Sequence, residues 1–129
     1  ELEASRGPWL AEPLPAAAIG WATALTATAL PERQPYPTLY PALAALLDAI
    51  CHAPSARGWS RVLIGYETLL LREMGYGGGD PPDPAGWDEL LAIFERLGKP
   101  LGRYALAGRR GDVMAARDML RERLGKIQG

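Results

Sequence analysis

The sequence has 129 residues, a formal net charge of −1 at pH 7, 48% hydrophobic residues and 22% charged residues. This balance is that of a folded globular chain and excludes a disordered one, and the length supports one domain with a modest core. The single cysteine, Cys51, excludes an internal disulfide and a cysteine-rich zinc site, and it fits a reducing compartment such as the cytoplasm. No apolar run is long enough for a signal peptide or a membrane span. Because the chain begins at Glu1 without a methionine, we expect a fragment of a longer protein.

The first predicted helix covers Pro15 to Leu30 and follows a linker over residues 1–14 that contains glycine and prolines. Pro15 suits a first helical turn, where its missing N–H is no loss. We expect Trp21 to lie off the apolar stripe of this helix, where it forms a second contact point. The stripe itself holds Ile19, Ala22, Leu25 and Ala29.

The second predicted helix runs from Thr38, which we expect to cap it, to about His52. It follows a proline-rich connection, residues 31–37, that cannot continue a helix. Its apolar stripe is Leu39, Leu43, Leu46, Leu47 and Ile50.

The third predicted helix, Trp59 to Met74, is apolar on two sides. Ile64 and Leu71 fall nearly opposite the main stripe, so the helix needs neighbours on both flanks. Either Gly75 or Gly77 is expected to end it in the left-handed conformation. The main stripe is Trp59, Val62, Leu63, Tyr66, Leu69, Leu70 and Met74, and the polar strip is Arg61, Gly65, Thr68 and Arg72.

Three further helical segments are predicted after a glycine- and proline-rich loop. Asp83 and Pro84 are expected to start the first, which Gly98 ends, and a short helix over residues 100–107 follows. The last helix begins near Gly111, with Val113, Ala116, Leu120, Leu124 and Ile127 inward and Arg117, Arg121, Arg123 and Lys126 mostly outward. Because alanine and leucine dominate and β-branched residues are scarce, we predict an all-α fold, a compact bundle of five to six helices around the central buried helix.

Catalytic chemistry is poorly supported, and we predict that the chain is not an enzyme. His52, the only histidine, follows Cys51, but adjacent helical residues point about 100° apart and cannot form a nucleophile–base pair. We expect Cys51 to be a small core residue instead. The glycines at 77–79 follow a helix and precede no Lys-Ser/Thr pair, so they do not form a phosphate loop.

Glu67 is expected to be a buried structural carboxylate. It lies at the edge between the two apolar sectors of the central helix, where an unpaired charge would cost several kcal/mol. We predict that it pairs with an arginine from the last third of the chain, with Arg103 and Arg117 as candidates.

Charge is unevenly distributed along the chain. Residues 1–98 contain 6 Lys/Arg and 12 Asp/Glu, a net charge of −6, whereas residues 99–129 contain 8 and 3, a net charge of +5. A basic end on an acidic body suggests an anionic partner. The alternative is a solvated helix face with no partner.

Several short segments of the chain are distinctive: Leu30 to Pro37 with Leu39-Tyr40, Tyr66-Glu67 with Leu69-Leu70, Gly75-Tyr76-Gly77, and Ala116-Arg117 with Leu120 and Leu124. Together these segments resemble the RecO family of bacterial recombination mediators. The resemblance covers about Glu3 to Leu124. It implies that residues 15–129 are a helical C-terminal domain and that residues 1–14 are a linker or the remnant of an upstream OB-fold domain.

The resemblance also implies partners and a cellular role. Members of this family anneal single strands, load recombinase together with RecR, and bind the acidic C-terminal tail of single-strand binding protein. The expected role is DNA repair in the bacterial cytoplasm at the nucleoid, with DNA held mainly by the missing N-terminal domain and no membrane contact. Candidate residues for a partner or the anionic tail are Arg61, Arg103, Arg109, Arg110, Arg117 and Arg121.

Two departures from the family pattern change these expectations. Many relatives carry a four-cysteine zinc module after the Gly-Tyr-Gly turn, whereas here residues 78–86 intervene without a cysteine, so we expect no zinc or other cofactor. Relatives often have an arginine before the aromatic-Glu pair, where this chain has Gly65. Arg61 or a C-terminal arginine would then have to replace it in holding the tail.

Two other classes of protein remain as alternatives. A helical ligand-binding or regulatory domain of a transcription regulator would need an internal apolar pocket with a few polar groups. A small enzyme would need the acid–base or metal constellation that the sequence lacks.

Overall fold

The computed structural model describes residues 13–30, 36–53, 55–75, 82–105 and 110–127. These residues form helices and contain no strand, which confirms the predicted all-α class. None of the described helices has the length and apolarity needed to cross a bilayer. The helices are α2 (Pro13–Ala29), α3 (Leu39–His52), α4 (Ala56–Glu73), α5 (Trp87–Pro100), the π-helical turn η1 (Leu101–Ala105) and α6 (Arg110–Gly125).

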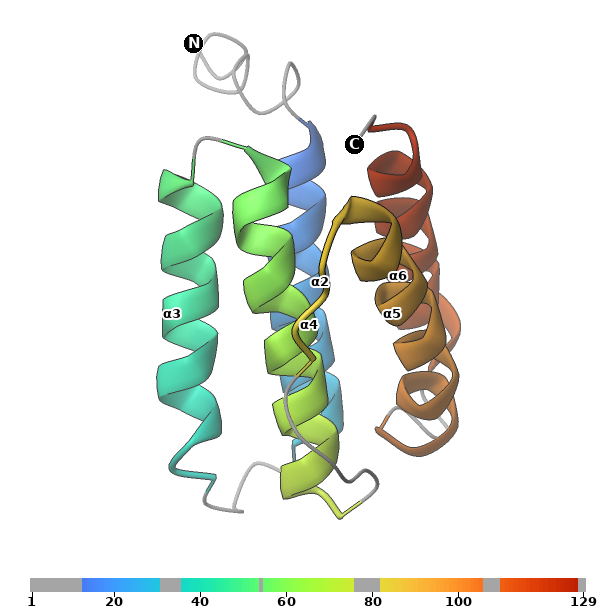
Figure 1. Cartoon of the computed structure of the whole chain (residues 1–129). Helices are drawn as coiled ribbons and strands as arrows, with labels where there is room; N and C mark the ends of the chain where they lie inside the picture. Colours follow the sequence, from blue (N-terminus) through green and yellow to red (C-terminus); the bar gives the residue numbers. More distant parts are fainter. Residues whose placement is uncertain (1–12, 31–35, 54, 76–81, 106–109, 128–129) are drawn as a thin grey trace, which may run out of the picture.

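Helix α4 lies at the centre of the bundle, as predicted. It packs against α3, α5, α2 and η1, while α6 lies along α2 and α5 (Figure 1). Because the chain crosses back between α4 and α5, these two helices run in the same direction (Figure 1). In Figure 1, α2 and α4 lie between α3 on one side and α5 and α6 on the other.

The residues of α4 explain its central place. Buried side chains occur around most of its circumference, so neighbours cover it on several sides. Val62 was expected inward, but it is 36% exposed. Gly75 ends the helix at φ +85°, the left-handed conformation that favours glycine. The buried residues of α4 are Trp59, Ser60, Leu63, Ile64, Tyr66, Glu67, Leu70 and Leu71.

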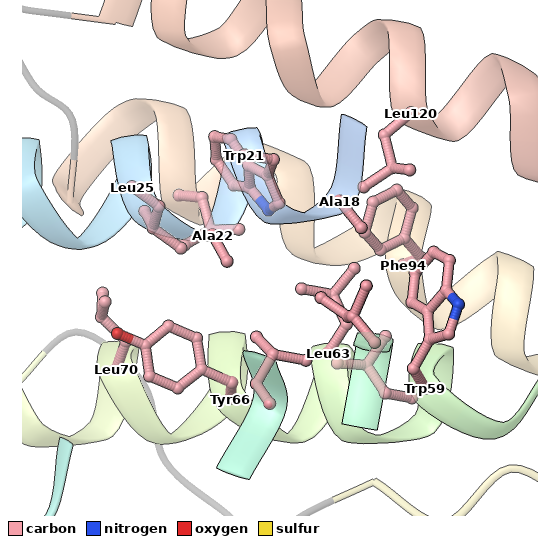
Figure 2. Close-up of a cluster of buried hydrophobic side chains, with 14 of the residues drawn as sticks. Ala18, Trp21, Ala22, Leu25, Trp59, Leu63, Tyr66, Leu70, Phe94 and Leu120 are labelled. Carbon is pink, nitrogen blue, oxygen red and sulfur yellow. The ribbon is translucent and has the colours of Figure 1, made fainter. Parts of the chain in front are cut away.

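Helix α2 buries more than one stripe. Trp21, expected off the main stripe as a second contact point, is fully buried, and its side chain lies above the side chains of α4 in Figure 2. The reason is that α2 is covered by α3, α4 and α6, so its buried face is broad. Ile19, expected inward, is only partly buried.

One predicted capping interaction and two predicted helix boundaries differ from the structure. Thr38 occupies the N-cap position of α3 but makes no capping hydrogen bond through its side chain, because its backbone is already helical. Asp83 and Pro84 do not start α5, which begins at Trp87, since the segment before it is tied to α4 (below). Gly98 does not end α5; the helix continues to Pro100 and widens into η1 in place of the separate short helix.

Candidate functional site

A buried ion pair joins α4 to α6. Glu67 is fully buried and Arg117 is 2% exposed. Arg117 donates from Nη2 to Glu67 Oε1 at 2.8 Å and from Nε to Oε2 at 3.1 Å, a bidentate pairing. The predicted buried carboxylate and its arginine partner are thus confirmed, with Arg117 as the partner.

Two further helices contribute to this network. Trp21 on α2 donates from Nε1 to Glu67 Oε2 at 2.7 Å. Arg117 also donates to the Phe94 carbonyl of α5 at 2.6 Å, and its guanidinium lies 3.8 Å from the centroid of the Phe94 ring. Buried charges are stable only when such hydrogen bonds replace water. One ion pair therefore fixes the relative positions of α2, α4, α5 and α6.

Gly98 makes room for this ion pair. A Cβ atom at residue 98 would lie 2.6 Å from Arg117 Nη1, well inside any normal contact. The sequence predicted a helix cap at Gly98, because a glycine after an apolar stripe commonly ends a helix. That pattern does not reveal which side chain lies opposite the glycine. In the structure, the missing side chain lets α6 place its arginine against α5.

A second buried polar contact joins α2 to α4. The Thr26 hydroxyl donates to the Ala22 carbonyl at 2.8 Å, so its oxygen accepts from the Tyr66 hydroxyl at 2.5 Å. Burial raises the pKa of Tyr66 above its ordinary value.

Among the candidate partner-binding arginines whose side chains are described, Arg117 is buried. It is bound to Glu67 and to the Phe94 carbonyl in the core, so it is not exposed to an anionic tail. Arg109 lies outside the described residues, and Arg110 begins α6 with a side chain that is not described. Arg103 is exposed on η1.

Arg61 holds the segment that crosses from α4 to α5. It pairs with Asp83 Oδ1 at 3.2 Å and donates to the Pro84 carbonyl at 2.5 Å. Pro84 is buried beneath this contact. Arg61, one of the arginines expected to replace the family arginine at Gly65, is therefore already bound to residues of its own chain.

A depression of about 360 Å³ lies between α5 and α6 and is open to solvent. Arg121 stands at its edge and pairs with Glu95 at 2.6 Å, both side chains being about half exposed. Two carboxylates and two cations make its lining electrically neutral, while Leu91 supplies apolar surface. We call this depression the α5/α6 groove; it is lined by Leu91, Glu95, Arg121, Glu122, Gly125 and Lys126.

The residues considered for nucleophilic or metal chemistry are not arranged for it. Cys51 is exposed, so its predicted place in the core was wrong; α3 packs through its other face. The His52 Nδ1 atom lies 2.9 Å from the Asp48 carbonyl oxygen of its own helix and 3.1 Å from the Asp48 carboxylate. Among the described residues no group of three or more His, Cys, Asp or Glu side chains could hold a metal ion. With one cysteine in the sequence, the donor set of a four-cysteine zinc module does not fit this chain.

The structure is an all-helical bundle that is fixed by a buried ion pair and has a solvent-open groove between α5 and α6. Residues 13–77 match the family described as "Recombination protein O C terminal". The chain is also similar to DNA repair protein RecO of Rhodospirillum centenum, with 41% identity over 68 residues that cover 53% of this chain and 26% of that protein. The RecO protein of Phenylobacterium zucineum is 33% identical over 96 residues, or 73% of this chain and 38% of its own length.

The chain belongs to the RecO family and corresponds to its C-terminal region. A third relative, DNA repair protein RecO of Caulobacter vibrioides, is 34% identical over 91 residues, 69% of this chain and 36% of that protein. The chain thus spans only about a quarter to two fifths of the length of these relatives. No solved structure matches the chain.

Proposed function

We propose that this chain is the helical protein-interaction region of a RecO-like recombination mediator that acts in DNA repair in the bacterial cytoplasm. It carries no catalytic step and needs no metal. In the full-length protein this region docks RecR, the acidic C-terminal tail of single-strand binding protein, or both, while an N-terminal domain holds most of the DNA during annealing and recombinase loading. The family match over residues 13–77 is the observation that supports this proposal most directly.

The α5/α6 groove is the proposed docking site for the acidic tail. Leu91 provides an apolar floor for an apolar chain end, and Arg121 and Lys126 provide two cations for carboxylates. Because Glu95 and Glu122 also line the groove, apolar contact supplies most of the affinity and the cations supply orientation. Arg121 must exchange Glu95 for the tail, which is a small cost for a half-exposed pair.

The experiment is a calorimetric titration of the chain with a peptide ending in Asp-Asp-Asp-Ile-Pro-Phe at several salt concentrations. Saturable binding that weakens with salt is expected, together with a loss of affinity in Arg121→Gln/Lys126→Gln. Absence of binding at low salt, or unchanged affinity in that variant, would contradict docking in this groove.

The alternative class, the ligand-binding domain of a transcription regulator, gains no support. The family match and the three relatives all point to RecO proteins. We therefore do not propose a regulatory small-molecule site.

A further inference from the structure

The outer surface of α2 and α3 is almost free of charge. In the described residues 13–30 and 36–53, Asp48 is the only Asp, Glu, Lys or Arg. The other 63 described residues contain 20 such charged residues. Helices that lack a charged face are normally covered on all sides. The exposed sides of α2 and α3 are therefore an unusual surface for a bundle that stands alone.

Helix α3 carries most of this surface. It packs mainly against α4 and α2, and it lies at the edge of the bundle in Figure 1. Its buried residues are Leu39, Leu46 and Ile50, so the opposite side of the helix is open to solvent. We call the exposed residues of α3, from Tyr40 to His52, the α3 face.

The α3 face offers aromatic and aliphatic surface to a partner. Tyr40 is 48% exposed, and Leu43 and Leu47 beside it are only partly buried. Tyrosine is enriched where protein interfaces gain most of their affinity, and charged side chains are depleted there. A phosphate backbone does not fit, because helix α3 contains no Lys or Arg. The chemistry of the α3 face therefore fits a protein surface that is itself poor in charge.

A second copy of the α3 face meets this requirement when it runs in the opposite direction. Tyr40, Ala44 and Asp48 follow one another at steps of four residues, so they form one ridge along the helix. In an antiparallel pair centred on Ala44, the Tyr40 hydroxyl of each copy lies opposite the Asp48 carboxylate of the other and donates to it. Two-fold symmetry makes this contact twice. Parallel pairing would instead place Asp48 against Asp48, and like charges repel.

The centre and the ends of this pair suit close contact. Ala44 is exposed and has a short side chain, so two helices can approach each other closely at the axis. The Asp48 carboxylate is 74% exposed and lies 3.1 Å from His52 Nδ1 in its own helix. Because a carboxylate accepts several hydrogen bonds, it can take the second donor without losing that contact.

The size of the α3 face sets the expected strength of the pair. Helix α3 has 14 residues and is therefore about 21 Å long. Contact along one such helix and the adjoining side of α2 buries a few hundred Å² on each copy, which is at the low end for a specific interface. The expected dimer is thus reversible and forms at micromolar or higher concentration.

We propose that the α3 face is a self-association surface, through which two copies of this chain form an antiparallel dimer with Ala44 on the two-fold axis. The α5/α6 groove lies on the other side of the bundle (Figure 1), so it stays open in the dimer. The dimer holds two such grooves in one particle. The inference does not depend on tail docking in the groove.

The first test is sedimentation velocity of the 129-residue chain from about 2 to about 200 µM. The weight-average mass should rise from that of one copy, 13.9 kDa, towards twice this value. Ala44→Glu brings two carboxylates together at the axis and should raise the dimer dissociation constant by about tenfold or more. Because residue 44 is exposed, the unfolding temperature should not change.

The matched control is Ala115→Glu, the same substitution at an exposed position of α6. This helix lies on the opposite side of the bundle from α3 (Figure 1). The dissociation constant of Ala115→Glu should stay within about twofold of the wild-type value. Equal weakening by both substitutions would overturn the proposal, because added charge alone would then explain the loss.

The second test is disulfide cross-linking under mild oxidation, which reads the register of the pair. Residue 44 meets its own copy at the axis, so Ala44→Cys/Cys51→Ala should form a covalent dimer. The two native Cys51 residues are separated by 14 residues along the helix axis, or about 21 Å, which a disulfide cannot span. Wild type should therefore cross-link about tenfold more slowly or less.

Two results would overturn the proposal outright. One is a chain that stays a monomer at the highest concentration, since the α3 face would then be covered by something other than a second copy. The other is cross-linking of wild type through Cys51 as fast as cross-linking of Ala44→Cys/Cys51→Ala, because the two helices would then not be antiparallel about Ala44.

Discussion

Removal of Arg117 tests the role of the buried ion pair. In Arg117→Met the methionine fills much of the same space, but Glu67 keeps only the Trp21 N–H as a partner in a fully buried position. Two charge-assisted hydrogen bonds to Glu67 and one hydrogen bond to the Phe94 carbonyl are lost. Breaking one side of a buried pair costs about 3–5 kcal/mol. Domains of this size are stable by about 5–15 kcal/mol, so about a fifth of the stability or more would be lost.

The assay is urea unfolding at pH 7, followed by circular dichroism. We expect Arg117→Met to lower the unfolding free energy by about 3–5 kcal/mol and the melting temperature by roughly 10–20 °C. The control is a double-mutant cycle that compares Arg117→Met, Glu67→Gln and the variant with both substitutions. Once the charge on Glu67 is gone, the loss of Arg117 should matter less, with a coupling energy of about 2–3 kcal/mol. A loss below about 1 kcal/mol, or strictly additive effects, would refute the reasoning.

Three other substitutions give distinct expectations in the same unfolding assay. Gly98→Ala should destabilise the chain by about 1–2 kcal/mol, because its Cβ displaces Arg117. Gly20→Ala in α2, where the space around residue 20 is open, should stabilise the chain by about 0.4–1 kcal/mol. Changes in unfolding free energy of the same sign in both variants would contradict this reasoning. Trp59→Ala should cost about 3–5 kcal/mol, since the side chain is 2% exposed, and a cost near zero would show that it is not a core residue. Tyr66→Phe should cost about 1 kcal/mol at pH 8 through its lost hydrogen bond to Thr26. Because the pKa of Tyr66 is raised in the folded state, its contribution to the unfolding free energy is complete below about pH 10 and is lost as pH rises further. The difference in unfolding free energy between Tyr66→Phe and wild type should therefore shrink above about pH 10. A constant difference would argue against the burial of the hydroxyl.

The central helix and the buried carboxylate could be predicted because their signals are local. The spacing of Trp59, Leu63 and Leu70 fixes which side of α4 is apolar, and Ile64 and Leu71 show that a second side is covered. Glu67 falls between those sides, so its burial and its need for a cation follow from the same pattern. The sequence does not decide between Arg103 and Arg117 as the partner of Glu67, because that choice depends on how α6 packs.

The features that escaped prediction are set by tertiary contacts. The sequence indicated a second contact at Trp21, but only the packing of α3, α4 and α6 around α2 shows that its side chain is fully buried. Gly98 carries the signal of a helix cap, and only the opposing Arg117 shows why a side chain is excluded there. Asp83 carries the signal of a helix start, yet Arg61 holds it in a connecting segment. The groove between α5 and α6 likewise exists only once both helices are placed.

The docking account is tested most directly by mapping the acidic tail peptide on the chain with backbone amide NMR. The account predicts that shifts concentrate at Leu91, Arg121 and Gly125 in the α5/α6 groove, grow to saturation with peptide, and leave α3 unchanged. Shifts concentrated on α3, or none at the lowest salt, would contradict it.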